Sequence, residues 1–277
     1  MLQEDDDVFL FKIMLNDVED NIKSEQFDSL TLRRKVSHNR ALVWWIATDG
    51  LCEPESASLF MLLSPQEQDR ANRFHFDKDR LSFTLAHSLC RGILSFCTGR
   101  PPNFFNFSVG DWGKPEVMAP PCFPQLRINI SHTRGMVAAA LIVDHDIGVD
   151  VESTHREVQA IKVAEKMFAP RENADLIAAP DYAKLKKFLS YWTLKEAYVK
   201  ATGKGLSQPL QAFSFDLASK AITFDNSLVD NSECWRFEQM HLKPAHILAV
   251  GLKHPTPKLV QIDIEEAPLN FLLSLSS

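Results

Sequence analysis

The sequence predicts an α/β (α+β) fold of two similar halves, each a small antiparallel sheet packed against a long helix. Three observations support this: period-two patterning within 127–152, long helical segments at 81–96 and 182–201, and a similarity between residues 84–91 and 193–200. The last two segments share Thr-Leu, an apolar pair and a terminal cation at equal spacing. If this marks a duplication, the halves are related by a pseudo-twofold axis, with a cleft between them suited to a ligand.

Composition and charge narrow the possible classes of protein. The chain has 277 residues, 45% hydrophobic and 24% charged, so it can bury one large core or two modest ones. A net charge of −6 offers no general attraction for nucleic acid or an anionic membrane. We therefore expect neither as a partner.

The sequence also indicates in which cellular compartment the protein is expected. It has no run of about 20 apolar residues, and its N-terminus is acidic, unlike that of a secretory signal. The five cysteines include no CxxC pair, which argues against a zinc site and a disulfide framework. We expect a cytoplasmic protein with reduced cysteines.

The first half is predicted to follow an acidic N-terminal extension, residues 1–40, in which no period is sustained. Residues 42–46 (LVWWI) are typical of a buried strand. Ser64, Pro65 and Glu67 then supply an N-cap, a first-turn proline and a capping-box glutamate, which predict the start of a helix. A second helix has apolar residues recurring from 81 to 96. We assign 41–143 to the N-terminal subdomain.

The second half is predicted to begin within a hairpin. Residues 127–131 and 136–143 form strands, and the turn 144–146 (DHD) leads into a return strand, 147–152. Helices at 160–167 and 182–201 follow, the second closed by Gly203. Strands are expected at 213–215, 221–224, 235–238 and 247–251. We assign 144–277 to the C-terminal subdomain, which carries the candidate metal ligands.

Asp150 and Glu152 are candidate ligands for a cation. Alternation along the strand places both, with Gly148, on the face opposite its branched residues. The two residues are about 7 Å apart at the backbone, so their carboxylates can converge on one hard cation. The alternative is a solvated strand face, because alternation alone produces such pairs.

Glu196 and Lys200 lie four residues apart and so share one helix face. A surface salt bridge, worth about 0.3 to 0.5 kcal/mol, is the simplest interpretation. The functional interpretation gives Glu196 to a metal and Lys200 to phosphate oxygens.

Two further segments carry groups suited to phosphate. Ser131 and His132 end a strand just before a turn, and they supply a hydroxyl and an imidazole side by side. Lys114 lies on a Gly-Lys-Pro turn. Either segment is also compatible with an ordinary polar loop.

Taken together and in this order, the features resemble those of the 4′-phosphopantetheinyl transferases, specifically the longer, monomeric, surfactin-synthetase-activating type. The matching motifs are Gly113-Lys114-Pro115, residues 129–133 (NISHT), residues 147–152 (IGVDVE) and residues 192–206 (WTLKEAYVKATGKGL). The last two are the most specific. The resemblance extends from about Leu63 to Asp216.

The resemblance implies two α/β subdomains with coenzyme A in the cleft between them. It implies these roles: Asp150, Glu152 and Glu196 as magnesium ligands, Lys200 on the pyrophosphate, Ser131 and His132 near the coenzyme A phosphates, Lys114 at the nucleotide end, and Arg70 as a basic contact. Glu67 departs from the pattern, because the best-aligned relative has a lysine there. The capping box gives Glu67 a structural role instead.

The activity implied is transfer of 4′-phosphopantetheine from coenzyme A to a serine of an apo acyl- or peptidyl-carrier protein, with release of 3′,5′-ADP. The candidate catalytic residues are Glu196, Lys200, His132 and Asp150, with Glu196, directly or through a water, as the base. Magnesium is the implied cofactor, and an acidic carrier protein the implied partner.

Some alternatives stay open at this point. A non-catalytic coenzyme A-binding relative and another magnesium-dependent phosphotransferase are the alternative functions. Lys184, Lys186 and Lys187 are either a docking patch for the carrier or a solvated helix face. A monomer is expected, because both halves are present in one chain.

Overall fold

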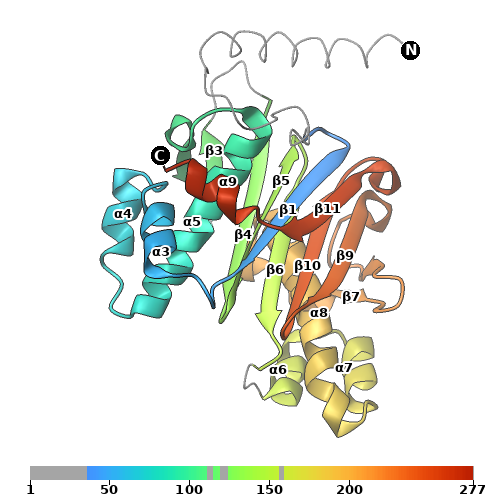
Figure 1. Cartoon of the computed structure of the whole chain (residues 1–277). Coiled ribbons are helices and arrows are strands. Elements are labelled where there is room, and N and C mark those ends of the chain that lie inside the picture. The colour runs from blue at the N-terminus through green and yellow to red at the C-terminus, as the bar shows by residue number, and fades with distance from the viewer. Residues whose placement is uncertain (1–35, 111–114, 119–123, 156–158, 277) are drawn as a thin grey trace, which may run out of the picture.

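A computed structural model describes residues 36–110, 115–118, 124–155 and 159–276 (Figure 1). The helices are α3 (Glu53–Phe60), α4 (Pro65–Ala71), α5 (Asp77–Thr98), α6 (Ala160–Met167), α7 (Pro170–Ile177), α8 (Asp181–Thr202) and α9 (Leu269–Ser274). The strands are β1 (Arg40–Ala47), β2 (Asn106–Val109), β3 (Pro115–Met118), β4 (Leu126–Thr133), β5 (Met136–Val143), β6 (Ile147–Ser153), β7 (Phe213–Phe215), β8 (Ile222–Phe224), β9 (Trp235–Leu242), β10 (His246–Lys253) and β11 (Gln261–Glu266).

The two halves repeat one order of elements. In the first half, β1 is followed by the 22-residue helix α5 and the hairpin β4–β5, and the sheet has the order β1-β5-β4. In the second half, β6 is followed by the 22-residue helix α8 and the hairpin β9–β10, in the order β6-β10-β9. Both long helices end at a glycine in the left-handed region, Gly99 and Gly203, each with φ of 68°. The predicted fold of two similar α/β halves is confirmed.

The predicted hairpin between 136–143 and 147–152 is wrong. β5 pairs with β1 on one side and β4 on the other, so neither of its edges is open to β6. β6 pairs instead with β10, from Ile147 opposite Leu252 to Ser153 opposite His246. The turn residues 144–146 therefore carry the chain from one sheet to the other.

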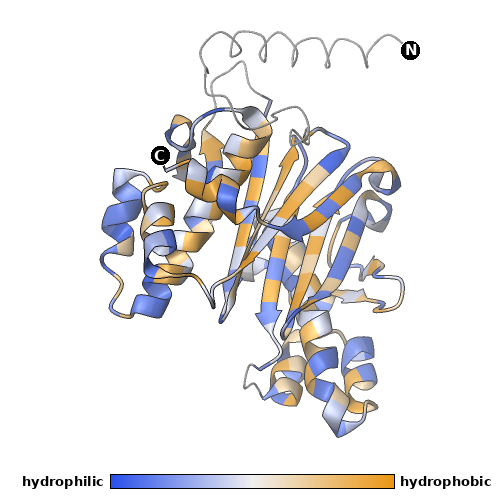
Figure 2. Ribbon diagram, viewed as in Figure 1, coloured by the Kyte–Doolittle hydropathy of each residue, from blue (hydrophilic) through white to orange (hydrophobic). Residues whose placement is uncertain are grey.

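Among the described residues, three large apolar cores lie between the layers of the fold, and a fourth, small one includes Ala71 of α4 and Phe83 of α5. One lies between α5 and the first sheet, one between α8 and the second sheet, and one between the two sheets. All of β5 is buried, because its alternate residues enter the α5 core and the core between the sheets. A strand covered on both faces has a continuous apolar sequence, and β5 is correspondingly hydrophobic along its length in Figure 2.

The last elements of the chain return to the first sheet. β11 pairs in parallel with β1, and α9 packs on α5 (Figure 1). Gly92 of α5 makes this packing possible, because a Cβ atom there would lie 2.1 Å from a Leu272 methyl carbon. The division at 143/144 stays a prediction, and residues 261–274 lie beside the first sheet.

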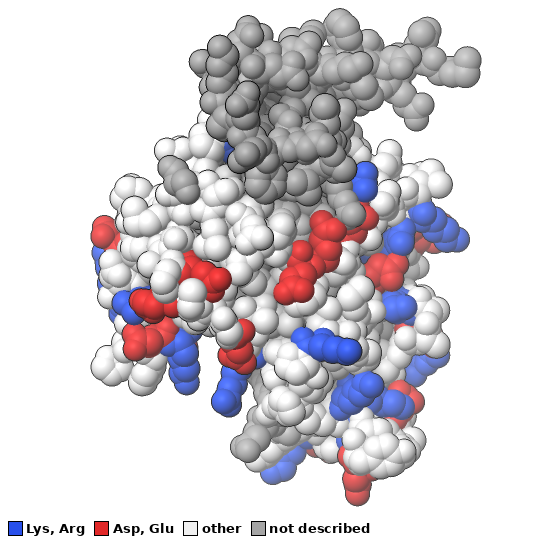
Figure 3. All heavy atoms as spheres, viewed as in Figure 1, with Lys and Arg blue, Asp and Glu red and all other residues white. Residues whose placement is uncertain are grey.

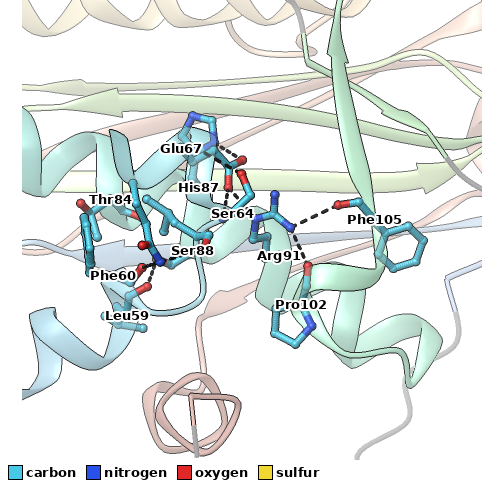
Figure 4. A network of polar contacts seen from close by, with 12 residues as sticks. Leu59, Phe60, Ser64, Glu67, Thr84, His87, Ser88, Arg91, Pro102 and Phe105 are labelled. Atoms are coloured by element: carbon cyan, nitrogen blue, oxygen red, sulfur yellow. Dashed lines mark hydrogen bonds and ion pairs between the residues drawn. The ribbon is translucent and has the colours of Figure 1, made fainter. Parts of the chain in front are cut away.

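The first half contains a buried ion pair, which we call the first clamp (Figure 4). The predicted capping box is confirmed, because the Ser64 N–H donates to Glu67 Oε2 at 2.8 Å and the Glu67 N–H donates to Ser64 Oγ at 3.3 Å. Arg91 of α5 donates to the same Glu67 oxygen at 2.7 Å. Arg91 also donates to the carbonyls of Pro102 and Phe105, at 2.6 and 3.2 Å, which flank a 3₁₀ turn.

The second half repeats this arrangement in a second clamp. Lys195 of α8 stands eight residues before Gly203, as Arg91 stands eight residues before Gly99, so the two positions are equivalent. The similarity of residues 84–91 to 193–200, which pairs Arg91 with Lys200, is therefore out of register with the structure. Lys195 Nζ lies 2.7 Å from Glu172 Oε2. Lys195 donates to the carbonyls of Leu210 and Phe213 at 2.8 and 2.7 Å, again around a 3₁₀ turn. Both charged side chains are fully buried, and burial lowers the pKa of Lys195 to about 8. The duplication thus extends to the buried charges.

The described surface carries charges of both signs. On the face shown in Figure 3, Lys and Arg are interspersed with Asp and Glu, and acidic side chains gather along β11. Among the described residues, no helix is both long and apolar enough to cross a membrane.

Candidate functional site

Strands β4 and β6 meet where the two sheets join, and side chains connect them. Asn129 Oδ1 accepts from the N–H of Val149 at 2.9 Å, and Ser131 Oγ accepts from the N–H of Val151 at 3.2 Å. These side chains satisfy backbone N–H groups that would otherwise be buried without partners. The junction therefore depends on polar residues at alternate positions of β4.

Lys200 reaches this junction from α8. Its Nζ donates to Asp150 Oδ1 at 2.7 Å and to Ser131 Oγ at 2.8 Å. Ser131 Oγ in turn donates to Asp150 Oδ1 at 3.0 Å. Asp150 Oδ2 is buried and has no hydrogen-bond partner. One oxygen of Asp150 is thus held by a cation, and the other is open to a further one.

Gly148 sets the distance between α8 and β6. A Cβ atom on Gly148 would lie 2.1 Å from the carbonyl oxygen of Ala197 and 2.5 Å from the nitrogen of Ala201. Both contacts are with helix backbone, which has no freedom to move aside. Glycine at position 148 therefore lets the backbone of α8 pack directly on β6, close enough for the Lys200 side chain to contact Asp150.

Asp150 and Glu152 do not form a solvated strand face, which excludes that alternative. They are 5% and 8% exposed, respectively, and Thr133 Oγ1 donates to Glu152 Oε2 at 3.4 Å. Glu196 lies on α8 one turn before Lys200 and is half-buried. Lys200 bonds to Asp150, so the simple surface-salt-bridge interpretation of Lys200 is also wrong.

The three carboxylates do not converge on one point. Across the described parts of the chain, no three His, Cys, Asp or Glu side chains lie close enough together to hold a metal ion. The cation beside Asp150 is the ammonium of Lys200. The assignment of Asp150, Glu152 and Glu196 as metal ligands stays a prediction.

His132 lies within a strand, although the sequence placed it at a turn. β4 continues to Thr133, and His132 is opposite Val137. Partial burial of the ring and the charge of Lys200 lower the pKa of His132 below its usual value. The imidazole is therefore neutral at pH 7, beside the group formed by Lys200 and Asp150.

Arg70 lies in the first half, on α4. Its guanidinium is 5.2 Å from the centre of the Phe83 ring, which is tilted against the His87 ring at 4.1 Å between ring centres. Asp79 and His87 of α5 also act electrostatically on His132. His132 is thus influenced by groups of α5 in the first half and by Lys200 of α8 in the second.

Lys114 and the lysines near the start of α8 were the other basic groups predicted to take part. Lys114 lies outside the described residues. Lys184 bonds to Asp181 at 2.6 Å, and Lys187 bonds to Asp175 at 2.9 Å. These lysines have acidic partners on their own or a neighbouring helix, as a solvated helix face would.

Sequence reasoning missed three contributors to the site. Asn129 and Thr133 belong to the polar row of β4, and His87 joins the first clamp. The alternation of Asn129, Ser131 and Thr133 was the available signal for the first two. His87 had none, because its partner Glu67 is on another helix.

The chain is similar to known proteins over most of its length. Residues 146–251 match a family model described as 4′-phosphopantetheinyl transferase superfamily, and residues 52–142 match one described as 4′-phosphopantetheinyl transferase, N-terminal.

Three curated relatives carry related names. The 4′-phosphopantetheinyl transferase HetI of Nostoc sp. is 36% identical over 168 residues, 60% of this chain and 70% of the relative. The 4′-phosphopantetheinyl transferase Sfp of Bacillus subtilis is 28% identical over 205 residues, 74% of this chain and 88% of the relative. The L-aminoadipate-semialdehyde dehydrogenase-phosphopantetheinyl transferase of Xenopus laevis is 25% identical over 234 residues, 76% of each chain.

Proposed function

Because this chain belongs to the 4′-phosphopantetheinyl transferase superfamily and is a phosphopantetheinyl transferase, we propose that its transfer centre lies at Asp150 and Lys200. The observation that carries this proposal is the 2.7 Å contact between Lys200 Nζ and Asp150 Oδ1. It joins the two most specific motifs of the sequence at the junction of the two sheets. No other described lysine contacts a carboxylate of β6.

Coenzyme A would bind along this junction through its phosphates. Lys200 and Ser131 present an ammonium and a hydroxyl 2.8 Å apart, which suits the oxygens of a pyrophosphate. His132, the next residue of β4, would offer its imidazole to a further phosphate oxygen. Arg70 and Lys114 are the proposed contacts for the remainder of the nucleotide. Lysine suits a polyphosphate, because it is a mobile point charge.

Magnesium is the proposed cofactor, with Asp150, Glu152 and Glu196 as its ligands. The donors fit a hard cation, because all are carboxylates and Asp150 Oδ2 is buried without a partner. The side chains of Glu152 and Glu196 would have to turn toward Asp150, since the three do not converge here. Bound magnesium would offset negative charge on the pyrophosphate.

The proposed reaction is a displacement at the β-phosphorus of coenzyme A. The carrier serine oxygen forms a bond to phosphorus, the bond between phosphorus and the bridging oxygen breaks, and 3′,5′-ADP leaves. Glu196 takes the serine proton, either directly or through a water, and Lys200 stabilises charge on the leaving group. Neutral His132 donates a hydrogen bond to a phosphate oxygen.

The partner is proposed to be an acidic apo carrier protein of the acyl or peptidyl type. A monomeric state and a cytoplasmic location remain predictions from the sequence. Retention of all three acidic positions favours a catalytic protein over a non-catalytic coenzyme A-binding relative.

Intact mass spectrometry of the carrier tests this function. The full chain is incubated with coenzyme A, Mg²⁺ and an apo carrier protein, beside a carrier whose acceptor serine is replaced by alanine. The carrier is expected to gain one phosphopantetheine, and both the serine variant and a reaction with EDTA should show no gain. No gain on fatty-acid, polyketide and peptide carriers alike would contradict the proposal.

A further inference from the structure

Histidine side chains from three segments gather where the chain crosses from the first sheet to the second. His145 lies in the turn 144–146, between β5 and β6. Its ring centre is 4.1 Å from that of His254, which follows β10, and 6.0 Å from that of His38, which precedes β1. None of these rings takes part in the proposed transfer centre. They bring together segments that belong to both halves.

The chain also crosses back between the sheets at this place. After β10 it returns through residues 254–260 to β11, which pairs with β1 of the first sheet. The Lys253 N–H donates to the carbonyl of Asp146 at 2.9 Å, so a backbone hydrogen bond joins the two crossings. The rings of His145 and His254 meet beside this bond, one from each crossing.

The hydrogen bonding of His254 requires a neutral ring. His254 is 6% exposed, and its Nδ1 accepts from the backbone N–H of Thr256 at 2.9 Å. A backbone N–H only donates, so Nδ1 carries no hydrogen and the hydrogen of the ring is on Nε2. Protonation of Nδ1 would place two hydrogens between the same pair of nitrogens. The bond that holds Thr256 in place is therefore lost when His254 becomes charged.

The surroundings of His145 also resist a positive charge. Burial, followed by the charges of His254 and His38, lowers the pKa of His145 below its usual value, although Asp144 and Asp146 act in the opposite direction. The Asp144 carboxylate is shared, because it lies 3.4 Å from His38 Nδ1. The nearby carboxylates therefore do not compensate for two charged rings in contact.

The surroundings of His254 act in the same direction. Burial and the charge of His38 lower the pKa of His254. The adjacent Lys253 is paired elsewhere, since its ammonium lies 2.7 Å from Asp230. On the other side, the His254 N–H donates to the backbone carbonyl of Cys234, which carries no charge.

We propose that His145 and His254 form a pH-sensitive latch between the two crossings, closed while both rings are neutral and opened when His254 takes up a proton. Protonation removes the acceptor of the Thr256 N–H and places a charge against His145. The segment 254–260 then separates from the turn 144–146. Because these crossings connect the two halves, mild acid loosens their connection. The latch is independent of the proposed function.

The direction of the pH dependence follows from the neutral rings. Histidines of the unfolded or locally opened chain have the usual pKa of 6.5, whereas those of the latch have lower values. The opened chain therefore takes up protons first as the pH falls. The latch is fully stable above about pH 6.5, and each unit below this value favours opening about tenfold per histidine until the folded rings are protonated too.

Amide hydrogen exchange at about pH 7.5 and about pH 5.5 tests the latch. Protection factors, which correct for the intrinsic pH dependence of exchange, are read by NMR for the N–H groups of Lys253 and Thr256, because these donate to Asp146 and His254. In the wild type, both should fall about tenfold at the lower pH. The N–H of Val250, within the central strand β10, should not change.

Two variants identify the titrating group. His254→Asn keeps an acceptor in place of Nδ1 but cannot titrate, so its protection factors should differ less than about twofold between the two pH values. His75→Asn is the matched control, because His75 precedes α5 and contacts the adjacent Phe76 ring. It should show the same fall as the wild type.

Unchanged protection of Lys253 and Thr256 in the wild type would overturn the latch. A fall that His254→Asn retains would show that another group titrates, and would overturn it as well. If His254→Asn does not fold, an NMR titration of the His254 ring in the wild type decides. A pKa of 6.5 or above would contradict a latch that a neutral ring closes.

Discussion

Lys200 and Asp150 are 50 residues apart in the sequence, yet their side chains meet at 2.7 Å and tie α8 to β6. Ser131 of β4 completes the contact from the other sheet, with its hydroxyl 2.8 Å from the Lys200 ammonium. A helix and two strands thus converge on one carboxylate. Changes that separate these elements should impair transfer even where no charged group is altered.

Gly148→Ala tests how closely α8 must lie to β6. The new methyl group would meet the helix backbone at 2.1 Å, so α8 should move away and draw Lys200 from Asp150. We expect a loss of at least about 2 kcal/mol in the free energy of unfolding and a marked fall in kcat. Gly251→Ala is the control, because Gly251 pairs with Gly148 but its new methyl group would meet the buried Phe237 ring at 2.5 Å, so it should also lower stability without moving α8 from β6. Equal effects of the two variants on kcat would contradict this account.

Ser131→Ala tests the shared hydroxyl. The change removes the acceptor of the Val151 N–H and a hydrogen-bond partner of both Lys200 and Asp150. Chemical denaturation should show a loss of about 1 to 3 kcal/mol in the free energy of unfolding, and kcat/KM should fall at least about tenfold. Thr133→Val removes only the 3.4 Å contact to Glu152 and should have the smaller effect on both.

A double-mutant cycle tests the second clamp. Lys195→Met or Glu172→Gln alone breaks a fully buried pair, and each should lower the free energy of unfolding by about 3 to 5 kcal/mol. The double variant leaves no uncompensated charge, so its loss should be well below the sum of the two. Additive losses, measured by urea denaturation, would mean that the two groups do not stabilise each other.

Because of the first clamp, the free energy of unfolding should decrease as the pH is lowered through the acid range. Glu67 has a pKa of about 2 in the folded protein against an ordinary value of 4.5. Its ionised carboxylate therefore contributes fully to the free energy of unfolding above pH 4.5, and this contribution is lost as the pH falls toward 2. The contribution at neutral pH is at most about 3 kcal/mol. Glu67→Gln should therefore unfold more easily than the wild type at pH 7, and the gap should narrow steadily below pH 4.5. A gap that is constant with pH would exclude this role for Glu67.

The sequence correctly predicted those helices and strands that are specified by residues within or next to them. The capping residues before α4, Gly203 after α8 and the period-two residues of β4 lie within or beside the element that they specify. α3 and α9 were missed because neither has a long amphipathic period, and α7 was missed although Pro170 opens it. β11 was missed because its mixed sequence pairs in parallel with a strand from the far end of the chain.

The remaining differences between the predicted and the observed fold arise from pairing between segments that are distant in the sequence. β6 could be recognised as a strand, but its partner β10 is about a hundred residues later, and proximity suggested β5 instead. Likewise, Lys200 was expected beside Glu196 on its own helix, although its acceptor is on β6. The candidate site residues were proposed from their motifs and stay a prediction, whereas the two clamps depend on contacts between helices that are distant in the sequence.

Binding of Mn²⁺, a paramagnetic substitute for Mg²⁺, tests the central claim most directly, because it reports on Asp150 without requiring turnover. Electron paramagnetic resonance titrations with coenzyme A present would compare the wild type, Asp150→Asn and the control Asp175→Asn, whose carboxylate bonds to Lys187 and Tyr191. We predict that the wild type and the control bind Mn²⁺ with similar affinity, and that Asp150→Asn binds it at least about tenfold more weakly. Equal affinity in all three proteins would contradict the assignment of the transfer centre to Asp150.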